Sequence, residues 1–479
     1  MKENLSPWMR GVLALVIFLL AGCEYVRPTL NAPLAKWDGT TGYRIRNLAP
    51  PIEGNTDSLF IVIAFSGGGT RASTLAFGAL RELARQPITW EGKSKRLLDE
   101  VDVIHALSGG TFTAAYYALF GDQIFHDFEY RFLRKDWEAE LKSRILLSPS
   151  NWFRLWSPYF GRSHVMAEIL DEALFEGRTY ADLLARRQRP LLIIHASDMA
   201  TLSRFEFMQT QFDIICSDLS RLPVARASAA SAALPLILSP LTFKNYAGGC
   251  GYEAPKELTQ EKRQGGIAAQ RANELLSYLD VEKRPYIHVL DGGLSDNMAL
   301  RGILEGAGLY GGLDRMLGLA GVKNVKKMVI LSVNAETSPD VLEYRSDNIP
   351  VLSKAMGAMV DLPINRYSAD TLTIMRFMVD KWRQDLRSKK RPAGSPFAPD
   401  TDIYFIDASF GEEEDPDERA ALMKIPTTMY LTDEQIDRLL VAASRLLHKD
   451  KEFQRLMHDL EADRAAAPAG SPAESPRSK

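Results

Sequence analysis

Short and almost continuous apolar runs recur along the chain, and longer stretches with a helical pattern separate them. The runs lie at residues 59–65, 101–107, 190–197, 212–217, 286–293, 328–335 and 402–410. Runs of this length that are rich in β-branched residues are typical of strands buried on both faces, and intervening helices are typical of parallel connections. The sequence therefore predicts an α/β fold, with a mostly parallel central sheet sandwiched by helices.

The segments outside these runs suggest how the chain is organised. We expect a tether or wrapping segment at 23–57, a main domain at 58–410 with an insertion near 125–165, C-terminal helices at 411–464 and a disordered tail at 465–479. The first of these segments is rich in Pro and Gly, and the last has a low-complexity composition. Residues 411–425 are predicted to be a loop. Residues 431–450 form an amphipathic helical pattern that Thr432 and Gln435 would begin with a capping box.

Residues 1–22 have the pattern of an export signal. Lys2 and Arg10 precede a short apolar run that is too short to span a bilayer, and small residues follow it. The end of this segment, Leu-Ala-Gly-Cys23, resembles a bacterial lipoprotein signal, which implies cleavage before Cys23 and acyl chains on that residue. The alternative is an uncleaved interfacial anchor. We expect a lipoprotein of the bacterial cell envelope, and Glu24 after the cysteine favours the outer membrane over the inner one.

Composition and charge exclude several classes of protein. The chain has 479 residues, of which 46% are apolar and 25% charged, which is ordinary for a globular protein and argues against disorder. Its net charge of −3 excludes a broadly basic nucleic-acid binder. Three cysteines exclude a disulfide scaffold and a multi-cysteine zinc site. Cys216 lies in an apolar run, which favours a buried thiol, although export would permit a disulfide with Cys250.

The insertion near 125–165 is dense in aromatic residues, including Trp137, Trp152 and Trp156. Such residues could pack in the core, line an acyl pocket or lie in a bilayer interface. Packing in the core is the favoured interpretation, because aromatic side chains dominate protein cores.

Three motifs follow predicted strands, and together they carry the chemistry. They are the Gly-rich turn Ser66–Arg71, the turn Ala106–Gly110 with Ser108 at its centre, and Asp291–Gly293. A serine between a strand and a helix fits a nucleophile elbow, and the Gly-rich turn offers backbone N–H groups to an anion. Because parallel strands end at one edge of a sheet, the motifs would supply a nucleophile, a base and an oxyanion site in one place.

The base is predicted to be an aspartate rather than a histidine. His105, His195 and His288 lie inside apolar strand runs, which favours packing in the core. Only His448 and His458 follow Asp291 in the chain, and both lie on polar C-terminal helices. A Ser108–Asp291 dyad is therefore favoured over a Ser–Asp–His triad.

In the order and spacing of these motifs, the chain resembles the patatin-like phospholipases. That family carries a Gly-rich oxyanion loop, a serine elbow and an Asp-Gly-Gly base, and residues 225–243 resemble its small-residue helix before the base. The Gly-rich and serine motifs are also similar to those of cytosolic phospholipases. The resemblance covers residues 58–300.

The resemblance implies a role for each motif. Ser108 would be the nucleophile and Asp291 the base, and Gly67, Gly68 and Gly69 would form the oxyanion hole. Arg71 would hold the substrate phosphate, with a structural ion pair as the alternative. The implied activity is a membrane-anchored serine acyl hydrolase of the phospholipase A type, acting on phospholipid or another acyl-ester lipid without a cofactor or metal. An acyltransferase with the same acyl-enzyme, or a catalytically silent lipid-binding lipoprotein, remains open.

Overall fold

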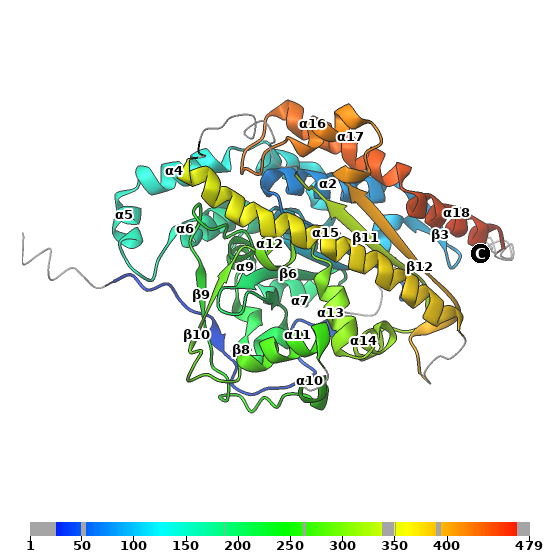
Figure 1. Cartoon of the computed structure of the whole chain (residues 1–479), viewed down its shortest axis with the longest axis horizontal. Helices are drawn as coiled ribbons and strands as arrows, with labels where there is room; N and C mark the ends of the chain where they lie inside the picture. Colours follow the sequence, from blue (N-terminus) through cyan, green and yellow to red (C-terminus); the bar gives the residue numbers. More distant parts are fainter. Residues whose placement is uncertain are drawn as a thin grey trace, which may run out of the picture.

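A mixed sheet of eight strands runs through the middle of the molecule, and helices cover both of its faces (Figure 1). The computed structural model describes residues 25–48, 54–186, 188–261, 265–337, 349, 351–388 and 394–466. The predicted α/β fold with a mostly parallel central sheet is confirmed. The predicted export signal at 1–22, the lipidation site Cys23 and nearly all of the predicted tail lie outside the described residues.

The strands follow the order β12-β11-β2-β5-β6-β10-β9, and β7 also pairs with β6. The first five are parallel to one another, whereas β10, β9 and β7 are antiparallel to their neighbours. All residues of the two adjoining strands β2 and β5 are buried, so both faces of the sheet are covered there. The strand bounds are Leu59–Phe65 (β2), Val101–Leu107 (β5), Leu191–Asp198 (β6), Arg204–Phe207 (β7), Leu241–Lys244 (β9), Tyr286–Leu290 (β10), Val325–Asn334 (β11) and Phe397–Ser409 (β12).

The direction of the crossovers decides which face each helix covers. The chain steps from β2 to β5 to β6 in one direction, and it returns from β10 to β11 and β12 in the other. Crossovers between parallel strands are right-handed, so the helices that connect β2, β5 and β6 lie on one face, and the helix that connects β11 to β12 lies on the other. Helices from the β10-to-β11 connection pack against the helix between β11 and β12. The first pass supplies α2 (Gly69–Arg85) and α3 (Gly109–Phe120). The second supplies α12 (Gly293–Asp296), α13 (Arg301–Leu309), α14 (Leu313–Leu319) and α15 (Leu352–Arg387).

Two C-terminal helices return to the first face. Helix α17 (Asp433–Lys449) packs on α2 and β12, and α18 (Lys451–Ala466) packs on β12 and β3 (Pro87–Trp90). Helix α17 begins at the predicted capping box, since the Thr432 hydroxyl accepts from the Gln435 N–H and the Gln435 side chain accepts from the Thr432 N–H. The expected C-terminal helices are therefore an integral layer of the fold.

Some local predictions are wrong. The run at residues 212–217 predicts a strand, but its first half lies in helix α8 (Gln209–Ile214). The 411–425 loop contains helix α16 (Pro416–Met423), which Asp415 caps. The side chain of His288 is exposed and bonded to Thr242 rather than packed in the core. In the first two cases a short apolar or charged pattern was compatible with two backbone periods, and tertiary packing decided between them. His288 does lie on strand β10, but on the exposed face of that strand.

The N-terminal segment wraps the domain from Tyr25 to Leu48. Its strand β1 (Ala32–Pro33) pairs with β8 (Ser217–Asp218), and Trp37 donates to the carbonyl of Cys250. Cys216 and Cys250 form a disulfide with a Cα–Cα distance of 5.5 Å, so the favoured prediction of a free buried thiol is wrong. No helix in the described part of the chain has the length and apolar character needed to cross a membrane.

The aromatic insertion divides into a buried and an exposed half. Phe128, Phe132 and Trp137 stack on one another in the core, as the favoured interpretation predicts. The second half contains α4 (Trp137–Leu146), α5 (Pro149–Leu155) and α6 (Arg162–Leu170), and Trp152 and Trp156 on or beside α5 are exposed. Core packing therefore accounts for only part of the insertion.

Candidate active site

Ser108 lies on a sharp turn between strand β5 and helix α3. Its backbone angles are φ 46° and ψ −126°, a conformation that a residue other than glycine rarely adopts. A Cβ atom on Gly109 would lie 2.0 Å from the carbonyl oxygen of Gly69, so only glycine fits where the two turns meet. A strained serine at a strand-to-helix turn is the geometry of a nucleophile elbow.

Asp291 directly follows strand β10, and its carboxylate contacts the Ser108 hydroxyl. The Ser108 hydroxyl donates to Asp291 Oδ2 at 2.8 Å, and the N–H of Gly293 donates to Oδ1 at 2.8 Å. Asp291 is only 4% exposed. Burial raises the pKa of its carboxyl to about 6, against the lowering effect of these two hydrogen bonds. The group is thus ionised at neutral pH and has a proton affinity suited to general base catalysis.

All seven histidines lie in the described part of the chain, and none is hydrogen bonded to Ser108 or Asp291. His105 and His195 instead form a buried pair with their ring nitrogens 2.9 Å apart, in agreement with the expected core packing. His448 contacts Glu82, and His458 contacts Asp459. Within the described residues, no cluster of His, Cys, Asp or Glu side chains could hold a metal ion.

The sequence matches the patatin-like phospholipase family over residues 63–304, which is about half of the chain. The chain belongs to the patatin-like phospholipase family. The predicted family is thereby confirmed. Among curated proteins, no sequence matches this chain.

Solved structures similar to this patatin-like chain include human GIVD cytosolic phospholipase A2, with 13% identity, a TM-score of 0.41 and coverage of 85% of this chain. This chain spans 60% of the human protein. VipD from Legionella pneumophila is 11% identical with a TM-score of 0.30, over 92% of this chain and 73% of VipD. The family assignment rests on the sequence match.

The Gly-rich loop of this patatin-like domain joins β2 to α2 beside Ser108. The N–H of Gly67 donates to the carbonyl of Asn297 at 3.1 Å, so Gly67 does not offer the oxyanion donor that we predicted for it. In the described part of the chain, the N–H groups of Gly68 and Gly69 have no acceptor. Both residues have positive φ, at 138° and 59°, a conformation that glycine permits. Gly68 and Gly69 remain the predicted oxyanion donors.

Arg71 does not have the environment expected of a residue that binds a substrate phosphate. Its side chain is buried, and it donates to the carbonyls of Ala335 at 3.0 Å and Ile425 at 2.5 Å. Burial lowers the pKa of its guanidinium to about 10, but the group stays charged at neutral pH. Arg71 therefore connects the start of α2 to the end of β11 and to the segment before α17. The Arg71 guanidinium is buried inside the fold and donates to backbone carbonyls. The structure therefore does not support its contact with a substrate phosphate.

Sequence reasoning missed Ser231, at the end of helix α9 (Val224–Ser231). Its hydroxyl accepts from the N–H of Ser108 at 2.8 Å and donates to the carbonyl of His195 at 2.6 Å. Its carbonyl accepts from the N–H of Gly292, and the carbonyl of Ala233 accepts from the N–H of Asp291. One short segment therefore bonds the backbone of both predicted catalytic residues. The small-residue pattern of residues 225–233 marked the segment, but sequence alone could not show which serine faces the elbow.

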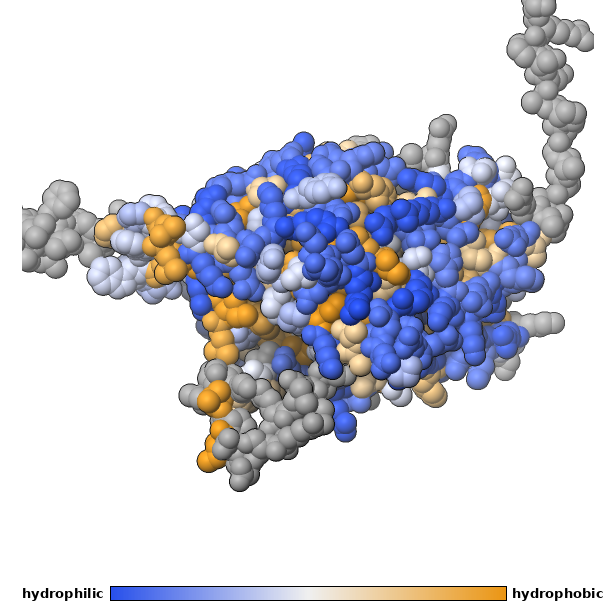
Figure 2. Space-filling model, turned by 90° about the horizontal axis from the view of Figure 1, so that it is seen from above, coloured by the Kyte–Doolittle hydropathy of each residue, from blue (hydrophilic) through white to orange (hydrophobic). Residues whose placement is uncertain are grey.

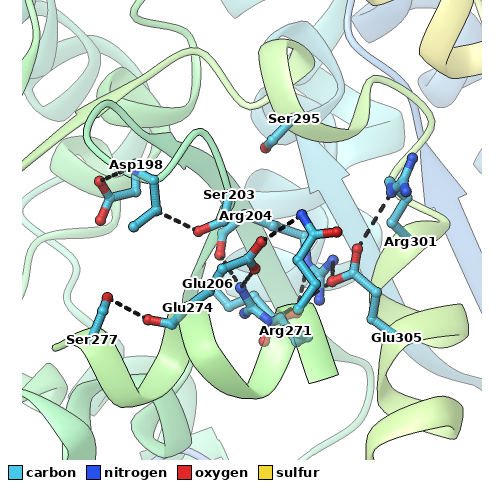
Figure 3. A network of polar contacts seen from close by, with 12 residues as sticks. Asp198, Ser203, Arg204, Glu206, Arg271, Glu274, Ser277, Ser295, Arg301 and Glu305 are labelled. Atoms are coloured by element: carbon cyan, nitrogen blue, oxygen red, sulfur yellow. Dashed lines mark hydrogen bonds and ion pairs between the residues drawn. The ribbon is translucent and has the colours of Figure 1, made fainter. Parts of the chain in front are cut away.

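A buried network of ion pairs involves strand β7 and helix α13 (Figure 3). Arg204 donates to Glu206 at 2.9 Å and to Glu305 at 2.6 Å, and Arg301 donates to Glu305 at 3.3 Å. Burial alone would raise the pKa of Glu206, but Arg204 and Arg271 outweigh it and lower the pKa to about 2. The network connects β7 and α11 (Gly266–Ser277) to α13, so charged side chains support the helix α13 that follows Asp291 in the chain.

Proposed function

We propose that this chain is a membrane-anchored serine lipid acyl hydrolase of the phospholipase A type that uses a Ser108–Asp291 dyad. The observation that carries the proposal is the 2.8 Å hydrogen bond from the Ser108 hydroxyl to the buried Asp291 carboxylate, in a member of the patatin-like family. The substrate would be a phospholipid or another acyl-ester lipid.

The mechanism moves one proton between the two residues. Asp291 Oδ2 takes the hydroxyl proton while Ser108 Oγ attacks the ester carbonyl carbon. The carbonyl oxygen becomes an oxyanion, which the N–H groups of Gly68 and Gly69 stabilise, and one such donor contributes roughly 3–4 kcal/mol to lowering the barrier. The bond to the leaving alcohol then breaks, and the alcohol takes the proton from Asp291. Water attacks acyl-Ser108 with Asp291 as its base, which releases the fatty acid and returns the proton to Ser108.

Anchoring is part of the proposal. A lipidated Cys23 would hold the domain at a bilayer of the bacterial cell envelope, in the outer membrane by the argument from Glu24. The Cys216–Cys250 disulfide supports an exported location, because disulfides persist in oxidising compartments. Metabolic labelling with a fatty acid that carries a clickable group tests it, since Cys23→Ser should lose the label.

A fluorophosphonate probe tests the dyad. We expect it to label the wild-type chain and Ser228→Ala, and to leave Ser108→Ala unlabelled. The absence of Ser108-dependent labelling, in folded protein with an accessible site, would favour the catalytically silent lipoprotein. Product analysis on phospholipid vesicles then separates hydrolysis from acyl transfer, because a transferase forms a new ester when an acceptor alcohol is added.

A further inference from the structure

The region around α5 carries an exposed apolar surface, which we call the apolar rim. It consists of Leu147, Trp152, Phe153, Trp156, Leu236 and Ile237, each of which is more than half exposed. Figure 1 places α5 at one extremity of the molecule, and Figure 2 shows apolar side chains gathered at that end. Large apolar side chains concentrated in one place on a soluble surface mark a contact with another apolar body.

The two parts of the apolar rim belong to one surface. Arg162, at the start of α6, donates to the carbonyl of Leu236 at 2.8 Å, and the Ser163 hydroxyl donates to the carbonyl of Ser239 at 2.5 Å. The loop after α9 therefore packs on the chain that follows Trp156.

The N-terminal segment enters the fold beside this surface. The ring of Tyr25 lies 6.4 Å from that of Tyr159, Ser157 donates to the carbonyl of Val26 at 2.7 Å, and Arg27 donates to the Tyr159 hydroxyl at 3.0 Å. Consecutive Cα atoms are about 3.8 Å apart, so chain connectivity keeps Cys23 within about 8 Å of Tyr25. Acyl chains on Cys23 would therefore enter a bilayer next to the apolar rim.

The apolar rim is also close to the predicted active site along the chain. The carbonyl of Ala233 accepts from the N–H of Asp291, and Leu236 is only three positions further along the chain. Leu236 has φ 75°, so this loop presents Leu236 and Ile237 to solvent through a conformation that leucine rarely adopts. The same loop thus connects the catalytic backbone to the exposed apolar surface.

We propose that the apolar rim is the face on which the enzyme lies against a lipid bilayer, so that the anchor and the active site meet the membrane together. This inference rests on the proposed function for its lipid substrate. Aromatic side chains prefer the bilayer interface, which suits Trp152, Phe153 and Trp156. Arg27 and Arg162 flank the rim, and within the described residues neither forms an ion pair, so both are available to lipid phosphates.

Fluorescence quenching tests the contact without requiring catalysis. The full-length Ser108→Ala chain is mixed with phosphatidylcholine vesicles, with and without phosphatidylglycerol, in which the lipids carry brominated acyl chains. We expect the lipids to quench tryptophan fluorescence, and the added Trp152→Phe and Trp156→Phe substitutions to remove most of that quenching. Equal fractional quenching with and without these two tryptophans would overturn the proposal.

A matched pair of variants tests the consequence for catalysis. Phe153 on α5 is 67% exposed and Phe377 on α15 is 68% exposed. We expect Phe153→Ser to lower vesicle hydrolysis about fivefold, by weakening interfacial binding, and to leave hydrolysis of a soluble short-chain ester unchanged. Phe377→Ser should change neither rate.

The outcomes separate this inference from the proposed function. If the vesicles quench tryptophan fluorescence but the wild-type chain shows no hydrolysis, the proposed hydrolase activity is wrong and the proposed membrane contact still stands. A dimer that Phe153→Ser dissociates, with no quenching, would overturn the membrane face in favour of a second copy of the chain.

Discussion

The backbone N–H of Ser108 donates to the hydroxyl of Ser231 at 2.8 Å, from a helix 123 residues further along the chain. The same serine donates to the carbonyl of His195 on β6 and lies 3.2 Å from the Thr111 hydroxyl, so hydrogen bonds fix its position. Ser231 thereby holds the strained elbow against the sheet, and we regard it as a positioning residue.

We expect Ser231→Ala to lower kcat about tenfold with little change in KM. The substitution removes a hydrogen bond that contributes about 1 kcal/mol, and the nucleophile loses its fixed position. Ser228 is the matched control, because it is fully buried on the same helix and its hydroxyl has no partner within the described residues. Equal kcat values for the Ser231→Ala and Ser228→Ala variants would remove the positioning role.

Activity should depend on the ionisation of Asp291. The proposed base acts as a carboxylate, and burial raises its pKa to about 6. We therefore expect kcat/KM on a soluble ester to rise with pH through an acidic limb near pH 6. Asp291→Asn should lower kcat/KM by a factor of about 10² to 10⁴. A limb near the ordinary pKa of an exposed aspartate would contradict the assignment.

The same shift has the opposite consequence for stability. Between the unfolded pKa of 3.8 and the folded value of about 6, the native state holds the Asp291 proton more tightly, so the free energy of unfolding falls as pH rises. Above pH 6 this lowers stability by about 3 kcal/mol. Asp291→Asn should therefore be more stable than wild type at pH 8, and should lose this advantage at pH 4. Denaturant unfolding of both proteins at the two pH values measures the difference.

Arg71→Met tests the corrected role of Arg71. The variant leaves the carbonyls of Ala335 and Ile425 without a donor, which should lower the free energy of unfolding by about 2–4 kcal/mol. Because the arginine supports the Gly-rich loop, we expect similar losses of rate on a phospholipid and on a neutral ester of the same acyl chain. A loss confined to the phospholipid would restore the prediction of phosphate binding.

The disulfide should contribute to stability through the loop that it closes. Cys216 and Cys250 are 34 residues apart. The chain-entropy model assigns a loop of this length roughly 3–4 kcal/mol. Replacing both cysteines with serine should lower the unfolding free energy by that amount and keep the Ser108-dependent rate at low temperature. An unchanged denaturation midpoint would show that the bond is not a stabilising element.

The central part of the fold could be predicted from sequence because burial leaves a strong pattern there. Strands β2, β5 and β11 read as continuous apolar runs, and the motifs that follow β2, β5 and β10 meet at one edge of the sheet. The strand prediction for residues 212–217 failed because a short, mostly apolar segment is compatible with a strand and with a buried helix. Helix α15 was missed, although it covers residues 352–387.

The prediction of the site failed where a role depends on a partner distant in the sequence. Gly67, Gly68 and Gly69 are identical as residues, and only the position of the Asn297 carbonyl separates the first from the other two. Likewise, no local sequence pattern distinguishes an arginine that binds a phosphate from one that, like Arg71, donates to the distant carbonyls of Ala335 and Ile425.

Strand β11 lies between β2 and β12, although it begins 21 residues beyond the segment that matches the family. A shorter chain that stopped at residue 304 would leave one whole side of β2, the strand that leads into the Gly-rich loop, without its hydrogen-bonding neighbour. The unpaired backbone groups of such an exposed edge strand can form hydrogen bonds with a strand of another molecule. Anyone who trims this chain to the recognisable family segment should therefore expect aggregates rather than a minimal folded domain.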